Sequence, residues 1–312
     1  MVNNDEKTAI LKAIAKYLDV PFAITDASSL TEAGYVGSDP DTCIRNLWLA
    51  ADKDVEKTER GIIFLDEFDK LARKSGTNRS TSADPGHEGV QQALLKIIEG
   101  DIASITEANR KHPDAPTVKI DTSNILFVCG GAFEGIEKVI DKRVGTANGF
   151  GLTKKDELGI DSTKNEVDRY NKLMDVVKPE DLKKYGILPE MLGRLPIICR
   201  LHQLKKEDLI HILTKPKNAI VKQFQVLFAM DGCKLRFDKN ALEFIAENAI
   251  KNKTGARALR TTVEDILLNT MYDLPSISAN SEEDCTPVLT VTKESVKTKK
   301  LKLDYVKKEA TA

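Results

Sequence analysis

The sequence is poor in aromatic residues and has no long apolar run. Aromatic side chains make up 5% of the 312 residues, so a surface that stacks nucleic-acid bases is not expected. No apolar run approaches the roughly 18 residues of a membrane helix, and the polar start, residues 1–8, lacks a signal-peptide core. The 47 Lys and Arg nearly balance the 48 Asp and Glu. We therefore predict no nucleic-acid partner and no membrane association.

Cysteine is sparse and widely spaced. The five cysteines are Cys43, Cys129, Cys199, Cys233 and Cys285, and no two of them form a Cys-x-x-Cys pair. Because zinc ribbons are built from such pairs, the sequence predicts no zinc site. An odd number of distant thiols is typical of a protein in a reducing compartment.

The remaining pattern is that of a folded α/β protein. Hydrophobic residues make up 41% of the chain and charged residues 30%. Continuous apolar runs at 62–65 and 125–128 are typical of strands buried on both faces of a parallel sheet. Shorter strands are expected at 22–24 and 197–199, and helices at 8–19 and 90–98. We assign residues 1–202 to a large α/β domain with a parallel sheet.

From residue 203 onward helical patterns dominate, and 203–312 are assigned to a smaller α+β domain. Its expected helices cover 209–213, 219–228, 241–250 and 256–272, and its expected strands 234–237 and 288–291. The Lys-rich tail, 297–308, is interpreted as a frayed end, with a basic interaction arm as the alternative. In the first domain, 74–89 is interpreted as a mobile loop and 154–172 as a polar surface insertion.

The acidic pair Asp66-Glu67 follows the apolar run at 62–65. The carboxyl end of a parallel strand is where α/β proteins bind ligands. Asp66 could hold Mg²⁺, and Glu67 could polarise a water for attack on a γ-phosphate. On this pattern alone, two acidic turn residues are the better interpretation.

The dipeptide Lys7-Thr8 opens the first expected helix. In a phosphate-binding loop, G-x-x-x-x-G-K-[ST], the Lys reaches the β and γ phosphates and the hydroxyl ligates Mg²⁺. Here Met1 and Glu6 stand at the two glycine positions. By itself, Lys7-Thr8 is therefore interpreted as a chance dipeptide.

Longer strings resemble the ClpX family of AAA+ unfoldases, which feed proteins to the ClpP peptidase. These strings are Leu18-Asp19-Val20-Pro21-Phe22, Thr31-Glu32-Ala33-Gly34-Tyr35-Val36-Gly37, Gly89-Val90-Gln91-Gln92-Ala93-Leu94-Leu95-Lys96, Pro189-Glu190-Met191-Leu192-Gly193-Arg194-Leu195-Pro196 and Lys253-Thr254-Gly255-Ala256-Arg257. The resemblance runs from about Lys7 to about Pro275. The related unfoldase HslU shares the general plan, but the strings are more similar to ClpX. The resemblance implies an AAA+ P-loop NTPase domain followed by a small α+β domain.

The resemblance also implies roles for the charged residues in an ATPase site. Asp66 and Glu67 match the Walker B pair, with Glu67 catalytic. Arg194 matches the arginine finger that reaches a neighbouring subunit's nucleotide, and Arg257 matches sensor 2. Lys7 and Thr8 match the end of the phosphate loop, so ATP and Mg²⁺ are the implied cofactors, with Thr8 and Asp66 as magnesium ligands. A surface or interdomain ion pair is the alternative for each isolated arginine.

Four further segments match loops that handle protein substrates or dock on the peptidase. Tyr35 and Val36 match the pore loop that grips a translocating chain, with a turn around a buried Tyr as the alternative. The loop 79–89 corresponds to a second pore loop. Arg110-Lys111-His112 matches a basic loop that receives the substrate's tag, with a solvated charge cluster as the alternative. Gly149-Phe150 matches the loop that docks on the peptidase, although Asn148 replaces its usual aliphatic residue.

We therefore predict an ATP-driven unfoldase that forms a homo-oligomeric ring, hexameric as the resemblance implies, and that threads unfolded or tagged proteins toward a ClpP-type peptidase. The expected compartment is the mitochondrial matrix, with the bacterial cytoplasm as the alternative. The rivals are an ATPase-deficient ring subunit and a fragment from a truncated gene model. A DNA-handling AAA+ protein is disfavoured by the balanced charge.

The phosphate loop carries the clearest departure from the family pattern. Glycines allow such a loop to wrap its N–H groups around phosphates. Glu6 replaces the last of them, and Asp5 adds a second negative charge. We therefore expect the chain to bind ATP poorly.

Replacing Asn148 by Leu is expected to tighten binding to a ClpP-type peptidase. An apolar side chain in a matching pocket contributes roughly 1.5–3 kcal/mol, and a ring multiplies the gain through avidity. Asn148 adds instead an amide that docking would remove from water. The measurement is the affinity of Asn148→Leu and of the unaltered chain for the peptidase. Equal affinities would mean that this loop does not dock.

Overall fold

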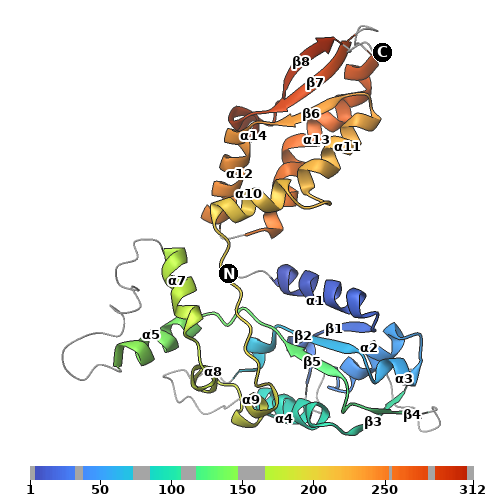
Figure 1. Ribbon diagram of the computed structural model, residues 1–312, viewed down its shortest axis with the longest axis vertical. Coiled ribbons are helices and arrows are strands. Elements are labelled where there is room, and N and C mark those ends of the chain that lie inside the picture. Colours follow the sequence, from blue (N-terminus) through green and yellow to red (C-terminus); the bar gives the residue numbers. More distant parts are fainter. Residues whose placement is uncertain are drawn as a thin grey trace. The chain divides into compact units, whose positions relative to one another are not determined.

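The protein consists of two units, each with its own hydrophobic core (Figure 1). The computed structural model describes residues 4–31, 38–72, 85–106, 117–146, 166–252, 255–279 and 285–307. Its contacts divide the chain between His202 and Gln203. Among the residues so described, no helix is both long enough and apolar enough to cross a membrane.

A parallel sheet forms the centre of the first unit. Its strands are β1 (Phe22–Asp26), β2 (Ile62–Asp66) and β5 (Leu126–Cys129), in the order β1-β2-β5. Asp26 lies opposite Asp66, so the carboxyl ends of β1 and β2 meet at one edge of the sheet. Every residue of β2 before Asp66 is buried, as its continuous apolar run predicts.

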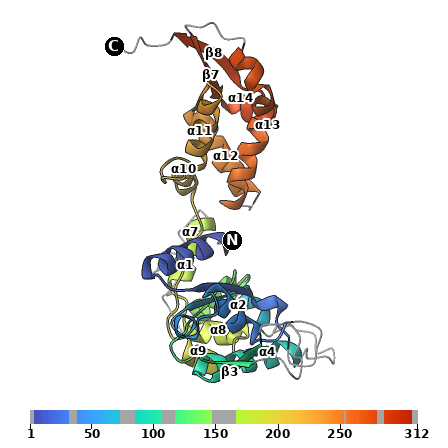
Figure 2. The same cartoon turned by 90° about the vertical axis from the view of Figure 1, so that its right-hand side faces the viewer.

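Helices cover both faces of this sheet (Figures 1 and 2). Ile63 and Leu65 belong to the core beneath α2 and α4, whereas α1 packs on β2 from the opposite side. The helices are α1 (Asn4–Leu18), α2 (Thr42–Ala50), α3 (Val55–Thr58), α4 (Pro85–Glu99), α5 (Ile136–Thr146), α7 (Glu166–Asp175), α8 (Pro179–Tyr185) and α9 (Pro189–Arg194). The short 3-10 helices are η1 (Ala27–Ser29) and η2 (Phe68–Leu71), and β3 (Ile102–Thr106) pairs with β4 (Thr117–Asp121) as an antiparallel hairpin.

A small domain forms the second unit. Its helices are α10 (Lys206–Thr214), α11 (Ile220–Met230), α12 (Lys239–Lys251), α13 (Arg257–Ala279) and α14 (Lys293–Thr298). Its strands are β6 (Lys234–Phe237), β7 (Cys285–Val291) and β8 (Lys302–Lys307), with β7 parallel to β6 and antiparallel to β8. Within this unit, Figure 2 shows the sheet at one end and α10 at the other. The four helices and two strands expected here are confirmed, with shifted ends.

Four expectations about local structure are wrong. The run 197–199 forms no strand, because none of the described strands offers its backbone groups a partner, and Ile197 is 84% exposed. The loop expected over 74–89 ends earlier, since α4 begins at Pro85. Of the polar stretch 154–172, residues 166–172 belong to α7 and include the buried Asn171, and the rest lies outside the described residues. The tail expected to fray instead forms β8, whose backbone pairs with β7.

A buried ion pair fixes α5 to α8. Asp181 is fully buried, and its two carboxylate oxygens accept from Arg143 Nε at 2.7 Å and Nη2 at 2.8 Å. Asp181 also accepts from the backbone N–H of Lys178 at 3.0 Å, and Arg143 donates to the Val176 carbonyl. The carboxylate therefore replaces its lost water with three donors.

The variant Asp181→Ala is expected to lower the free energy of unfolding by about 3–5 kcal/mol, because it leaves a guanidinium partly buried without its partner. Denaturant unfolding of both chains measures the difference. Lys183→Ala on the same helix is the control, and its exposed side chain predicts a change within about 0.5 kcal/mol. A similar small change for both variants would contradict the role of the pair.

Candidate functional site

The acidic pair lies in a sharp turn at the carboxyl end of β2. Asp66 is the last residue of the strand, and Glu67 adopts a left-handed conformation with φ 54° and ψ 30°. The Glu67 N–H donates to Asp66 Oδ1 at 2.8 Å. A non-glycine residue with positive φ is uncommon and clusters at functional sites.

Two backbone hydrogen bonds join this turn to the end of β5. Gly130 N–H donates to the Leu65 carbonyl at 2.8 Å, and Phe68 N–H donates to the Gly130 carbonyl at 2.8 Å. A side chain at position 130 would lie 2.5 Å from the Phe64 ring, and one at position 131 would clash with the Asp69 carboxylate. Only glycine therefore lets the loop after β5 approach η2 so closely.

Lys7 reaches this same edge from α1. Its ammonium donates to the carbonyl of Gly131, and its side chain passes beside Gly130. The structure thus brings Lys7 to the loop that is bonded to the Asp66-Glu67 turn. Thr8 follows on α1 and is half-buried. These four residues are the ones that could hold a magnesium-bound triphosphate.

The two predicted arginines lie in different units. Arg194 ends α9, and its Nε and Nη2 each lie 3.1 Å from Glu99 Oε1 at the end of α4. Both side chains are more than 40% exposed, so this ion pair contributes about 0–1 kcal/mol to the stability of the fold. Arg194 can therefore exchange Glu99 for another partner at little cost. Arg257 is the exposed first residue of α13 in the second unit.

The substrate-handling residues lie outside the described part of the chain. These are the pore-loop residues Tyr35 and Val36, the basic triplet Arg110, Lys111 and His112, and the docking residues Gly149 and Phe150. Their roles stay predictions.

Asp69 is a site residue that the sequence analysis missed. It is 7% exposed, and its Oδ2 accepts from the Phe133 N–H at 3.2 Å. Tyr185 packs against Phe133 with ring centroids 5.4 Å apart. Burial, together with the negative charges of Asp69 and Glu134, raises the Tyr185 pKa to about 12. In the sequence, Asp69 is visible only as a third acid soon after Asp66-Glu67. Its contact with the Gly130-Gly131 loop becomes apparent only in the fold.

The buried thiols near the sheet are unsuited to catalysis. Burial raises the pKa of Cys43 to about 12 and also raises that of Cys129. Both therefore stay protonated at neutral pH and do not act as nucleophiles. No cluster of three or more His, Cys, Asp or Glu suited to a metal occurs among the described residues.

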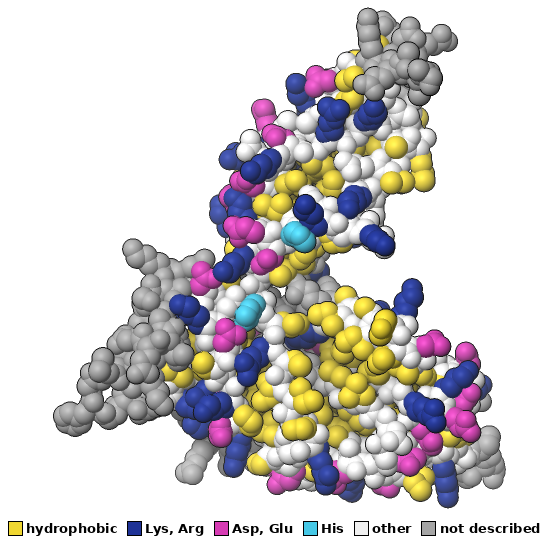
Figure 3. Space-filling model, in the orientation of Figure 1, with side chains coloured by type: hydrophobic (Ala, Val, Ile, Leu, Met, Phe, Trp, Pro, Cys, Tyr) yellow, Lys and Arg dark blue, Asp and Glu magenta, His cyan; other side chains and the backbone are white. Residues whose placement is uncertain are grey.

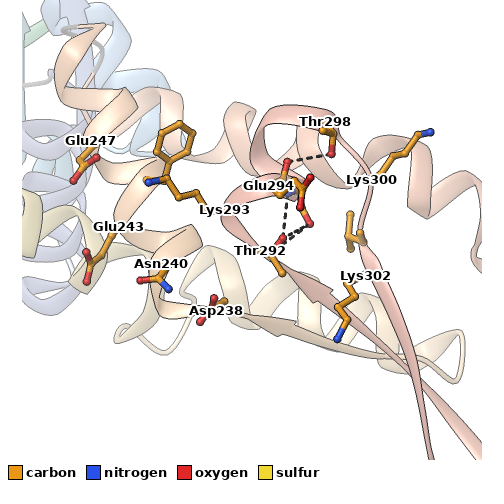
Figure 4. Close-up of a pocket in the computed structure, with 13 residues that line it drawn as sticks. Asp238, Asn240, Glu243, Glu247, Thr292, Lys293, Glu294, Thr298, Lys300 and Lys302 are labelled. Atoms are coloured by element: carbon orange, nitrogen blue, oxygen red, sulfur yellow. Dashed lines mark hydrogen bonds between the residues drawn. The ribbon is translucent and has the colours of Figure 1, made fainter.

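A groove in the second unit is lined by none of the candidate site residues described so far. It runs between α12, α14 and the start of β8 (Figure 4). The Lys293 and Lys297 ammonium groups lie 5.4 and 5.5 Å from the centroid of Phe244, and Lys206 bridges Glu243 and Glu247. The threonines Thr292 and Thr298 bond within α14. These contacts explain how α14 is capped and held.

Comparisons with known proteins agree with the division of the fold. A family described as "AAA domain (Cdc48 subfamily)" matches residues 2–198, and one described as "C-terminal, D2-small domain, of ClpB protein" matches 204–286. The first match covers the unit with the parallel sheet, and the second covers most of the small domain.

Curated relatives carry the name "ATP-dependent Clp protease ATP-binding subunit ClpX". The relative from Treponema denticola is 49% identical over 278 residues, which cover 88% of this chain and 65% of that protein. The relative from Porphyromonas gingivalis is 48% identical over 271 residues, 86% of this chain and 64% of that protein. The relative from Bacteroides thetaiotaomicron is 44% identical over 304 residues, 97% and 67% respectively. The chain thus spans about two thirds of the length of these bacterial relatives, and none of them supports the expected mitochondrial location.

Gly131→Ala is expected to lower the free energy of unfolding by about 1–3 kcal/mol, because the new methyl group and the Asp69 carboxylate would occupy the same space. Gly193→Ala is the matched control. Position 193 lies in α9 with nothing within 4 Å of the added methyl, so Ala there should be neutral or stabilise by up to about 1 kcal/mol. Thermal or denaturant unfolding distinguishes the two. Equal stability of both variants would contradict the close approach at position 131.

Proposed function

Because the chain belongs to the ClpX family of AAA domain proteins, we propose that it is an ATPase subunit that unfolds proteins for a ClpP-type peptidase. The single observation that carries this proposal is the hydrogen bond from Lys7 to the loop after β5, which is itself bonded to the residues on both sides of the Asp66-Glu67 turn. A lysine and two carboxylates at this edge suit the phosphates and metal of a nucleotide.

Lys7, Thr8, Asp66 and Glu67 have side chains suited to bind magnesium and the terminal phosphates of ATP. Asp66 and Thr8 would hold the metal, and Lys7 would hold phosphate oxygens in exchange for the Gly131 carbonyl. The left-handed turn would let Glu67 orient a water without moving Asp66. Bound ATP supplies the free energy of γ-phosphate hydrolysis.

The segment before Lys7, at the position of the phosphate-binding loop, fits ATP less well. Helix α1 begins at Asn4, so the backbone is already helical at Glu6, where a glycine normally ends the loop. The first N–H groups of a helix do favour anions. The sequence has two acids in this first turn, Asp5 and Glu6, and their negative charge opposes the binding of an anion. We infer weak ATP binding, and an ATPase-deficient ring subunit is the second candidate that this observation favours.

Assembly into a ring would place Arg194 at a neighbour's nucleotide. Its exposed ion pair with Glu99 is weak enough to be exchanged for a phosphate. Figure 3 shows hydrophobic side chains gathered on the visible face of the first unit. Exposed apolar residues of this unit include Ile10, Ile14, Tyr17 and Leu18 along α1, and such a stripe is typical of an interface. Unfolded or tagged proteins would then pass the pore loops around Tyr35 and Arg110.

Titration with ATP and Mg²⁺ tests whether Glu6, at a glycine position of the phosphate-binding loop, weakens ATP binding. The unaltered chain should bind ATP more weakly than micromolar, and Glu6→Gly should bind about tenfold more tightly because it removes a negative charge beside the phosphates. Calorimetry gives both affinities. Glu56→Gly, an exposed acid of α3, is the control for a charge change elsewhere and should leave the affinity unaltered.

Micromolar affinity of the unaltered chain for ATP would contradict the inference that the altered phosphate-binding loop weakens ATP binding. Binding that is absent from both the unaltered chain and Glu6→Gly would favour the ATPase-deficient subunit instead.

A further inference from the structure

We propose that Asp69 is a positioning residue of the ATPase site, whose buried carboxylate holds the loop 131–133 and, through it, the ammonium of Lys7. The importance of this contact for hydrolysis rests on the proposed function. The contact itself concerns only residues of the first unit that the structure describes.

The carboxylate of Asp69 lies directly against the loop after β5. One of its oxygens accepts from the Phe133 N–H, and the other lies where any side chain at Gly131 would have to go. Asp69 is 7% exposed, and a buried carboxylate is costly unless its oxygens accept hydrogen bonds. The loop and the carboxylate therefore fix each other.

The same loop supplies the acceptor for Lys7. Its Gly131 carbonyl accepts from the Lys7 ammonium, while the Gly130 carbonyl accepts from Phe68 N–H on η2. Asp69 belongs to η2 as well, so the loop is attached to that short helix at Gly130 and again at Phe133. Between these two attachments lies the carbonyl that holds Lys7.

This arrangement matters because a lysine side chain is long and flexible. Four carbons separate the ammonium from the backbone, and ordering them costs conformational entropy. An acceptor held at a fixed place keeps the ammonium at the edge of the sheet before a nucleotide arrives, which is preorganisation. If Asp69 served only to stabilise the fold, its loss would loosen the unit without a selective effect on Lys7.

Acylation of lysines by an amine-reactive ester, followed by mass spectrometry of the native chain, tests the proposal without ATP. Lys12 and Lys16 lie exposed on the same helix and serve as internal references. In Asp69→Ala, Lys7 should react about tenfold faster relative to these references, as expected when a hydrogen bond to a charged group is lost. Asp69→Asn keeps the shape of the side chain, and should give a smaller increase and remain folded if the Ala variant does not.

Thr122→Val is the matched control. Thr122 is also buried in the first unit, and its hydroxyl donates to the Ile97 carbonyl at 2.7 Å, a contact that involves neither Asp69 nor Lys7. It should lower stability without changing the relative reactivity of Lys7. Unchanged Lys7 reactivity in both Asp69 variants, or an equal increase in Thr122→Val, would overturn the proposal.

The hydrolysis of ATP is measured in parallel. If the unaltered chain hydrolyses ATP, Asp69→Asn should lower kcat more than it alters KM. If the unaltered chain shows no hydrolysis while Lys7 still responds selectively to Asp69, the positioning role stands and the proposed function fails.

Discussion

The tie between the carboxyl ends of β2 and β5 is the constraint on which the rest of the site depends. Two backbone hydrogen bonds, from Gly130 to Leu65 and from Phe68 to Gly130, hold the strand ends together. They decide where the Asp66-Glu67 turn lies and where the carbonyl that receives Lys7 lies. Backbone hydrogen bonds in a buried sheet are costly to break, so they give the site a rigid base.

The glycine pair makes this tie possible. The Phe64 ring fills the space that a side chain at Gly130 would need, and the Asp69 carboxylate fills that at Gly131. The Phe64 ring and the buried Asp69 carboxylate thus pack directly against the Gly130-Gly131 loop. Phe64 of β2 and Asp69 of η2 therefore shape the surface against which the neighbouring loop packs, and α1 packs on β2 as well.

Much of the fold could be predicted from the sequence because its signals are local. The apolar run at 62–65 predicts β2, and the helical period of the small domain predicts α10 to α13. The predictions of a strand at 197–199 and of a frayed tail are wrong because a strand needs a partner strand, and the partner is often distant in sequence. Residues 302–307 found such a partner in β7, whereas none of the described strands pairs with 197–199.

The candidate site shows the same division between local and distant information. Residue type and resemblance predicted Lys7, Asp66 and Glu67, and the structure places all three at one edge. Asp69 was missed because its role arises from contact with Gly131 and Phe133, which are distant in sequence. The altered residue Glu6 was visible in the sequence, and the structure adds that the backbone there is helical.

We propose that Glu67 acts on a nucleotide held at this edge. The most direct measurement is the rate of ATP hydrolysis at millimolar ATP and Mg²⁺ by the purified chain and by Glu67→Gln, which keeps the shape of the side chain and removes its charge. The account predicts slow hydrolysis by the unaltered chain and a loss of about 100-fold or more in Glu67→Gln. Equal rates of hydrolysis in the two chains would contradict it.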